Sequence, residues 1–435
     1  MATTQTDPAL QLESRVSAYP TNGIRATSGE GIWITAADGQ KYLDGCAGTF
    51  NIGLGFKHPK VVSAIENVMQ RGILNGSTTL RNELVEEAEK ELVSVAPSGL
   101  DRCHLKGCTG GSTAVEQAVR HAWANTGRHG LLSFNGSHHG QTIATSLLSG
   151  MDFRKSRLGG VTFPVSAVPA PDCYRCPCGK SPHSCRVECA EEVVAAIEAR
   201  QGSPQDAVAA FVAEPILGAG GGIVPHRRYW PKISEQLRKR NVLLIFDEVQ
   251  TFGRTGEFFA ADYFEVSADM IAVAKAISGI GVPGTGGLLL PHSMCILDSG
   301  ERSLTWGGSN IVAAAIVATI REMKRPGFMK QVARVGYYIN TELQRMCATY
   351  DFVGCVRGVG LMTGLEIVES KQSRRPNIPL AARIIDVCRD SGLLLRQSAY
   401  EHGSFVKVRP ALTITLDEAR ELCRRLEHAL RTCTQ

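Results

Sequence analysis

The sequence predicts an α/β protein with a large domain, built on a mostly parallel sheet covered by helices, and a smaller α+β domain. The chain has 435 residues, which is too many for one ordinary core. Between about residues 100 and 310, short apolar runs alternate with amphipathic segments, a pattern typical of parallel strands joined by helices. After residue 310 this alternation ends, and a long helical stretch precedes separate strand-like pieces.

The sequence pattern of the N-terminal part predicts a hairpin followed by a helix. Residues 31–44 predict two strands that turn at Asp38-Gly39, because Asp-Gly is a strong turn signal. Residues 59–71 predict a helix, because apolar side chains recur there at helical spacing. In the central part, the predicted strands are 130–134, 208–213, 242–246, 270–274 and 286–290, and the predicted helices are 113–124, 191–200 and 229–240.

The C-terminal part predicts a helix at 311–323 and strands at 360–367 and 404–408. We therefore expect a large domain at 61–310 and a small domain at 311–435, which the N-terminal segment 17–60 joins. The polar residues 1–16 are expected to be irregular.

Composition and charge exclude several classes of function. Hydrophobic content is 43% and charged content 20%, as in ordinary globular enzymes. The net charge of +5 is spread along the chain, which predicts binding to neither nucleic acid nor membranes. No apolar run approaches the roughly 18 residues that span a bilayer. Residues 1–8 lack the apolar core of a secretory signal, so we expect a cytoplasmic protein.

The chain has fourteen cysteines, and a reducing compartment accounts for such a number without a disulfide framework. Five of them fall in one short stretch: Cys173, Cys176, Cys178, Cys185 and Cys189. Four cysteines can bind zinc tetrahedrally, but this spacing is not that of a common zinc module. We favour a reduced or redox-sensitive loop without metal and keep zinc as the alternative.

Two ionisable residues stand where predicted strands end. Lys275 follows the strand 270–274, and Asp247 follows the strand 242–246. In parallel sheets, ligands bind beyond the carboxyl ends of the strands. Pyridoxal phosphate needs a lysine for its Schiff base and a carboxylate on its pyridinium nitrogen. Taken alone, Lys275 could be a solvated strand end, and Asp247 could belong to a helix cap. Taken together, the two residues predict a pyridoxal-phosphate site.

A glycine-rich helix start supplies the expected phosphate anchor. Residues 109–116 read Thr-Gly-Gly-Ser-Thr-Ala-Val-Glu, so glycines and hydroxyls open a predicted helix. Exposed N–H groups and the helix dipole favour a phosphate there. Without Lys275, an ordinary helix cap would be the better interpretation.

With these motifs, the chain resembles the class-III aminotransferases, which are fold-type-I pyridoxal-phosphate enzymes. The resemblance runs from the hairpin to about residue 415, and its most specific part is the segment 247–256 followed by Lys275. The segment reads Asp-Glu-Val-Gln-Thr-Phe-Gly-Arg-Thr-Gly and lacks one glycine of the family pattern. The resemblance implies that Asp247 binds the pyridine nitrogen, Val249 packs on the ring and Gln250 bonds the ring hydroxyl.

The resemblance also implies how the phosphate and the ring are held. Gly111 and Ser112 would bind the phosphate, and Thr305 would reach it from the other subunit of a homodimer with shared active sites. His138 takes the place of an aromatic residue that stacks on the ring in the family. The alternative is that His138 and His139 are two surface histidines in a loop.

Substrate recognition departs from the family pattern at two positions. Gln141 replaces an arginine that often binds a substrate carboxylate. Glu214 matches a glutamate that pairs with a distant arginine, but Lys407 occupies that arginine's place. Lysine lacks the planar, bidentate grip of arginine, and Arg409, two residues on, would share its face of a strand. These departures argue against a 4-aminobutyrate- or ornithine-type substrate with 2-oxoglutarate, without excluding it.

The function that the resemblance implies is transfer of an amino group from an amino acid or ω-amino compound to an oxo acid. Lys275 would carry the Schiff base and act as general base. A decarboxylating transaminase, a racemase or an amino-lyase of the same family is the alternative, because of His138, Gln141 and Lys407. A non-catalytic protein is disfavoured by the presence of both Asp247 and Lys275.

Overall fold

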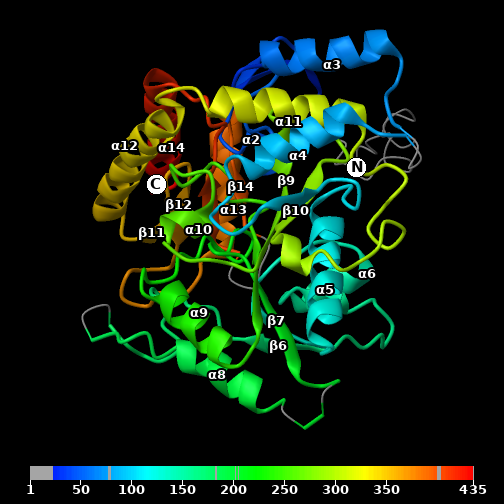
Figure 1. Ribbon diagram of the computed structural model, residues 1–435. Helices are drawn as coiled ribbons and strands as arrows, with labels where there is room; N and C mark the ends of the chain where they lie inside the picture. The colour runs from blue at the N-terminus through cyan, green and yellow to red at the C-terminus, as the bar shows by residue number, and fades with distance from the viewer. Residues whose placement is uncertain are drawn as a thin grey trace, which may run out of the picture.

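The computed structural model describes residues 23–76, 80–181, 184–200, 202–203, 205–398 and 403–434. The polar segment 1–16, which we expect to be irregular, lies outside these residues. The described chain forms three sheets with helices packed around them (Figure 1).

Within the described residues, the largest sheet has seven strands in the order β4-β10-β9-β8-β7-β5-β6. Two four-stranded sheets have the orders β1-β2-β3-β13 and β11-β12-β15-β14. The strands are β1 (Ala26–Glu30), β2 (Trp33–Ala36), β3 (Lys41–Asp44), β4 (Arg102–His104), β5 (Gly130–Phe134), β6 (Val165–Val168), β7 (Val208–Ala213), β8 (Leu243–Asp247), β9 (Met270–Ala274), β10 (Gly286–Leu290), β11 (Val353–Val359), β12 (Met362–Ile367), β13 (Leu393–Leu394), β14 (Arg396–Gln397) and β15 (Phe405–Val408).

The helices lie between these strands and after them. They are α2 (Ala47–Phe50), α3 (Pro59–Arg71), α4 (Glu83–Val93), α5 (Gly111–Thr126), α6 (Ile143–Leu148), α7 (Asp152–Lys155), α8 (Ala190–Glu198), α9 (Tyr229–Lys239), α10 (Ala260–Tyr263), α11 (Asn310–Met323), α12 (Phe328–Thr349), α13 (Ile378–Asp390) and α14 (Leu416–Thr432), with short 3-10 turns η1 (Lys275–Ser278) and η2 (His292–Met294). No helix in the described part of the chain is long and apolar enough to cross a membrane.

The seven-stranded sheet confirms the predicted mixed α/β fold with a mostly parallel sheet. The strands β6, β5, β7, β8 and β9 pair in parallel, whereas β10 pairs antiparallel with both β9 and β4. Four of the five predicted central strands have the expected bounds. The exception is β8, which is shifted by one residue: it begins at Leu243 and ends at Asp247, because Asp247 still pairs with Ala272 of β9.

Both faces of this sheet are buried, which explains its continuous apolar strands. In β7, Ala210 and Val212 pack on the side of α5, while Phe211 and Ala213 join the core that contains Trp230 of α9. Figure 1 shows α5 and the α8–α9 pair on opposite sides of the central strands. The sheet is therefore held rigidly between two layers of helices, and its strand ends are fixed positions for side chains.

The N-terminal hairpin forms as predicted and pairs with the C-terminal part of the chain. Gly39 lies at the turn with φ +83°, and its N–H donates to the carbonyl of Ala36. Strand β3 then pairs in parallel with β13, where Leu43 faces Leu393. The helices α12 and α13 pack against the sheet that contains β11, β12 and β15. The division into domains at residues 60 and 310 stays a prediction.

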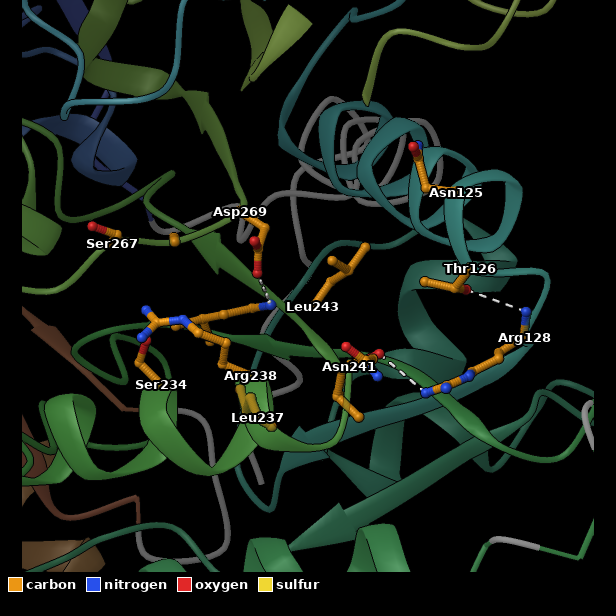
Figure 2. A pocket seen from close by; sticks show the side chains of 13 residues that line it. Asn125, Thr126, Arg128, Ser234, Leu237, Arg238, Asn241, Leu243, Ser267 and Asp269 are labelled. Carbon is orange, nitrogen blue, oxygen red and sulfur yellow. Dashed lines mark hydrogen bonds between the residues drawn. The ribbon is translucent and has the colours of Figure 1, made fainter. Parts of the chain in front are cut away.

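At the opposite end of β8 from Asp247, polar groups hold the strand and helix ends together (Figure 2). A depression of about 460 Å³ lies there, and Arg128 donates from Nη1 to the carbonyls of Val208, Arg240 and Asn241 at 3.0–3.3 Å. Asp269 accepts the N–H of Leu244 at 2.7 Å. These side chains form hydrogen bonds with main-chain atoms at the amino ends of the parallel strands. The predicted catalytic residues, Asp247 and Lys275, lie at the carboxyl ends.

Candidate active site

A cavity of about 500 Å³ lies at the carboxyl ends of β8 and β9. It brings together Gly111, Ser112, His138, Asp247, Val249 and Lys275, which the sequence predicts for the cofactor, from four separate segments of the chain, whereas Gln250 and Thr305 do not line it. Among the residues that line it are Gly111, Ser112, His138, Gln141, Asp247, Val249 and Lys275. Asn51, His139 and Thr285, which the sequence did not single out, line it as well.

Lys275 is the first residue after β9 and is held in an uncommon conformation. Its φ is +49°, in the left-handed region that costs a non-glycine residue about 1–3 kcal/mol. Burial lowers the pKa of its ammonium group, against the opposing effect of the Asp247 and Glu214 carboxylates. Lys275 is therefore more readily available as a neutral amine than an exposed lysine, as a nucleophile requires.

Asp247 is buried at the end of β8 and is oriented by two donors. Its Oδ2 lies 2.8 Å from Nδ1 of His139, and its Oδ1 accepts the N–H of Val249 at 3.1 Å. His139 is 2% exposed, and its N–H donates to Ser149 Oγ at 2.9 Å. No motif in the sequence assigns a role to His139, although its position beside His138 is a usable signal. The alternative of two surface histidines is wrong for this residue.

The start of α5 forms a cradle with room for an anion. A Cβ on Gly111 would lie 3.0 Å from Cγ1 of Val249, so only glycine fits there without displacing the cavity wall. Gly140 has φ +140°, and a Cβ there would clash with Ser112 Oγ. The first N–H groups of a helix have no intrahelical acceptors and carry the positive end of its dipole. This geometry suits a phosphate.

His138 borders the cavity as a neutral imidazole. Its N–H donates to Oε1 of Glu214 at 2.9 Å, and its Nδ1 is buried with no hydrogen-bond partner in the part of the chain that the structure describes. Burial, followed by the positive charges of Arg154 and Lys275, lowers the pKa of His138 to about 4. The ring therefore stays uncharged near neutral pH.

Glu214 and Arg409 are both buried but do not pair directly. The two oxygens of Glu214 accept main-chain N–H groups, from His138 and from Gly218 at 2.8 Å, and burial raises the pKa of its carboxyl group. Arg409 donates to Gln250 Oε1 at 2.7 Å and to the carbonyl of Gly218 at 3.0 Å. The guanidinium group of Arg409 is thus engaged by two acceptors of the chain. The amide N–H₂ group of Gln250 takes no part in this contact.

Lys407 and Arg409 share one face, as their spacing predicts. The Lys407 Nζ lies 5.7 Å from the centre of the Phe50 ring, and the Arg409 guanidinium carbon lies 4.8 Å from it. Lys407 is 6% exposed. Burial and the charge of Arg409 lower the pKa of Lys407 to about 7. A buried lysine with this pKa changes charge in the physiological range.

Thr305 lies outside this cavity in the chain's own fold. It is exposed in the loop between β10 and α11, and its carbonyl accepts Asn75 Nδ2 at 2.8 Å. A single chain therefore does not bring Thr305 to the phosphate cradle.

In its described residues, the cysteine-rich loop holds no group of side chains arranged as a metal site. Within the described residues, no three His, Cys, Asp or Glu side chains gather as a metal site would require. All fourteen cysteines are free thiols. Burial, together with the neighbouring thiols, raises the pKa of Cys189 to about 12. The loop is attached to β12 by Arg175, which donates to Glu366 at 2.8 Å.

These features fit one cofactor. The cavity combines a half-buried lysine and a buried aspartate at adjacent strand ends, a glycine cradle at a helix start, and the buried ring nitrogens His138 Nδ1 and His139 Nε2, which have no partner among the described residues. The fold and this site define a pyridoxal-phosphate enzyme of the transaminase type. The chain belongs to the aminotransferase class-III family, whose model matches residues 16–430.

Relatives from this family include two activities. A leucine/methionine racemase from Thermococcus litoralis is 32% identical over 425 residues, which cover 96% of this chain and 92% of that protein. A probable 4-aminobutyrate aminotransferase from Bacillus subtilis is 29% identical over 425 residues, covering 96% and 95%. The fold matches that of an (S)-enantioselective omega-transaminase from Thermomicrobium roseum, with a TM-score of 0.87, 28% identity and 98% of both chains covered.

Proposed function

We propose that this pyridoxal-phosphate-dependent transaminase uses Lys275 as its Schiff-base lysine and proton carrier, and Asp247 as the partner of the pyridine nitrogen. One observation carries the proposal: both residues end neighbouring strands and line one cavity, with the glycine cradle of α5 in the same wall. The amino group moves from an amino acid or ω-amino compound to an oxo acid.

Each of these residues has a separate task. Bound pyridoxal phosphate supplies an electron sink for the bond that breaks at the substrate carbon. The Lys275 amine, with its lowered pKa, would hold the cofactor and, once free, would take the proton from the substrate carbon. Asp247, fixed by His139 and the Val249 N–H, keeps the pyridine nitrogen protonated. Gly111 and Ser112 would bind the phosphate through the helix start, and Gln250 would bond the ring hydroxyl.

A half-reaction without oxo acid tests this function. Purified protein is mixed with single amino donors, and the absorbance of the bound cofactor is followed. We expect a stable conversion to the pyridoxamine form with at least one donor, which also identifies that donor. No band from a lysine-bound cofactor, with cofactor supplied, would leave the role of Lys275 without support.

Racemisation is the second candidate function, because a leucine/methionine racemase is among the similar relatives. Its signature in the same experiment is different. The cofactor absorbance would change and return, while the substrate loses its optical purity and no amino group accumulates on the cofactor.

Lys407 gives a pH-dependent prediction for substrates that carry a carboxylate. We propose that Gln141, Glu214, Lys407 and Arg409 surround the substrate. The ammonium form of Lys407 exists below its pKa of about 7, so affinity for a carboxylate should fall as the pH rises through that value. A hydrogen bond to a charged group is worth about 1.5–3 kcal/mol, which corresponds to roughly a ten- to hundredfold loss in kcat/KM.

The variant Lys407→Arg should lose this decline, because arginine stays charged. Lys330→Arg, an exposed change on α12, is the matched control and should keep the decline. An unchanged pH profile in Lys407→Arg would contradict a role for Lys407. Arg409, Cys46 and Glu214, which are buried, and the exposed Arg396 all act on the Lys407 charge, so the position of the decline is read in the wild-type protein.

We also propose a homodimer in which Thr305 reaches the partner's phosphate site. An exposed apolar patch, formed by Ile73, Leu74 and Trp306, supports it, with exposed fractions of 58%, 39% and 69%. Asn310 holds this patch together, donating to the carbonyls of Ile73 and Leu74 at 2.8 and 2.9 Å. Large exposed apolar patches mark interaction surfaces.

The double variant Ile73→Asp, Trp306→Asp should therefore sediment as a monomer in sedimentation velocity. It should also lose affinity for the cofactor, because Thr305 no longer reaches a partner. Tyr337→Asp, a change at another exposed aromatic side chain, should leave the dimer intact. A dimer that survives both aspartates would contradict the assignment of this patch. The fourteen free thiols support our proposal of a cytoplasmic location.

A further inference from the structure

Asn51, the residue that follows α2, lines the cavity with its side chain held in one orientation. Its Oδ1 accepts the main-chain N–H of Thr49 at 2.8 Å, and this donor identifies the oxygen end of the amide. A Cβ on Gly48 would lie 2.9 Å from Oδ1, and a Cβ on Gly281 would lie 2.8 Å from Nδ2. The two glycines therefore leave the space that the amide group occupies.

The nitrogen end of this amide is an available hydrogen-bond donor. Nδ2 of Asn51 has no acceptor in the described part of the chain, because the hydrogen bond of this side chain is made through Oδ1. Nδ2 is also not sealed from solvent, whereas Nδ1 of His138 is. An amide nitrogen carries two N–H groups, so Asn51 offers them to an oxygen that enters the cavity.

The segment before Asn51 is held in a costly conformation. Ala47 has φ +47°, and Phe50 has φ +65°, in the left-handed region that residues with a side chain rarely adopt. Asp44, which is 3% exposed, fixes the turn by accepting the N–H of Gly48 at 2.6 Å. Conformations of this kind persist only where the surrounding structure enforces them, and they cluster at functional sites. The fold thus places Asn51 at the cavity wall against a local preference.

Phe50 connects this part of the wall to two buried cations. Its ring contacts Lys407 and Arg409, at 5.7 Å from Nζ and 4.8 Å from the guanidinium carbon. The donor of Asn51 therefore stands one residue along the chain from a contact with both positive charges, which favours an acceptor with negative charge. The cofactor phosphate has donors of its own at the start of α5, so the donor of Asn51 is left for a second anionic group.

We propose that Nδ2 of Asn51 donates to the carboxylate of the substrate, and that Asn51 thereby selects amino and oxo acids over amines without a carboxylate. This inference rests on the proposed function and names its substrate class. A hydrogen bond to a carboxylate is shorter and stronger than one between neutral groups, so a single fixed amide can orient the substrate. Asn51 is a specificity-determining residue that no sequence motif indicated.

The test compares Asn51→Asp and Asn51→Ala with Asn135→Ala, a change at an exposed asparagine outside the cavity wall. Asn51→Asp keeps an acceptor for the Thr49 N–H and replaces the N–H₂ group by an oxygen, so it preserves the local fold. Half-reaction rates are measured for two matched pairs of donors: alanine with ethylamine, and 4-aminobutanoate with butylamine.

In Asn51→Ala we expect a roughly ten- to hundredfold loss for the carboxylate member of a pair, and rates near wild type for its amine. Asn51→Asp should lose at least as much for the carboxylate member, because like charges repel. Asn135→Ala should behave as wild type for all four donors.

Binding of succinate and of propanoate to the holoenzyme, measured by calorimetry, gives a readout that does not depend on turnover. Asn51→Asp should weaken both to a similar degree, with an unchanged melting temperature and cofactor absorbance. The proposal is overturned by unchanged affinities in both Asn51 variants, by equal losses for both members of each pair, or by a wild-type protein that binds neither acid. The proposed function fails separately, in a wild-type protein in which no cofactor is bound to Lys275.

Discussion

Replacing Lys275 by alanine is expected to abolish turnover while leaving the protein folded and able to bind cofactor. Two tasks are lost together, attachment of the cofactor and transfer of the proton at the substrate carbon. Proton transfer by a positioned side chain alone contributes roughly 10²–10⁴-fold to rate. The phosphate cradle of Gly111 and Ser112 and the contacts of Asp247 do not involve the lysine, so cofactor should still bind noncovalently.

The measurement combines steady-state turnover with equilibrium binding of pyridoxal phosphate. A small primary amine such as methylamine, added to Lys275→Ala, should restore part of the half-reaction, because it can enter the space that the side chain leaves. Rescue would assign the missing function to the amine and exclude a folding defect. Turnover close to that of wild type would show that another residue carries the proton.

The sequence predicted most of the fold because the physical signals were local. Strands buried on both faces read as continuous apolar runs, so β5, β7, β9 and β10 have the bounds that we expected. Lys275 and Asp247 could be found because they end such runs. The start of α5 was less well predicted, since the helix begins at Gly111 rather than Thr113. Glycine destabilises the interior of a helix, so the sequence pattern does not mark it as helical. Whether a helix starts at a glycine depends on which groups of the fold approach it closely.

The contacts that join distant segments could not be read from the sequence. His139 meets Asp247 across 108 positions, and Arg409 meets Gln250 across 159. Such pairs depend on how strands and loops pack, and no spacing encodes them. Family patterns suggested that Glu214 would face a cation, whereas here two main-chain N–H groups take both its oxygens.

His139 shows how the site keeps Asp247 in one orientation. The imidazole Nδ1 and the Val249 N–H hold the two carboxylate oxygens separately, so the group cannot rotate freely. His139 is itself fixed by Ser149 through its main-chain N–H. A carboxylate held in advance needs no reorganisation when the reaction starts, which is the main source of electrostatic catalysis.

The variant Asp247→Asn should keep this shape and lose the charge. The amide oxygen can still accept the Val249 N–H, but a neutral group no longer holds the pyridine nitrogen in its protonated form. Removal of one preorganised electrostatic group lowers kcat on the order of 10²–10³-fold, and we expect a loss of this size with cofactor still bound. Single-turnover half-reactions should show the defect in the step that removes the substrate proton.

Asp269→Asn is the matched control for this prediction. Asp269 is a partly buried carboxylate just before β9, at the opposite edge of the sheet, where it accepts the Leu244 N–H at 2.7 Å. Its replacement should lower the free energy of unfolding by about 1 kcal/mol, the net worth of one hydrogen bond, and leave kcat unchanged. If both variants lost activity equally, the effect would reflect damage to the sheet. A loss confined to Asp247→Asn would locate it at the pyridine nitrogen.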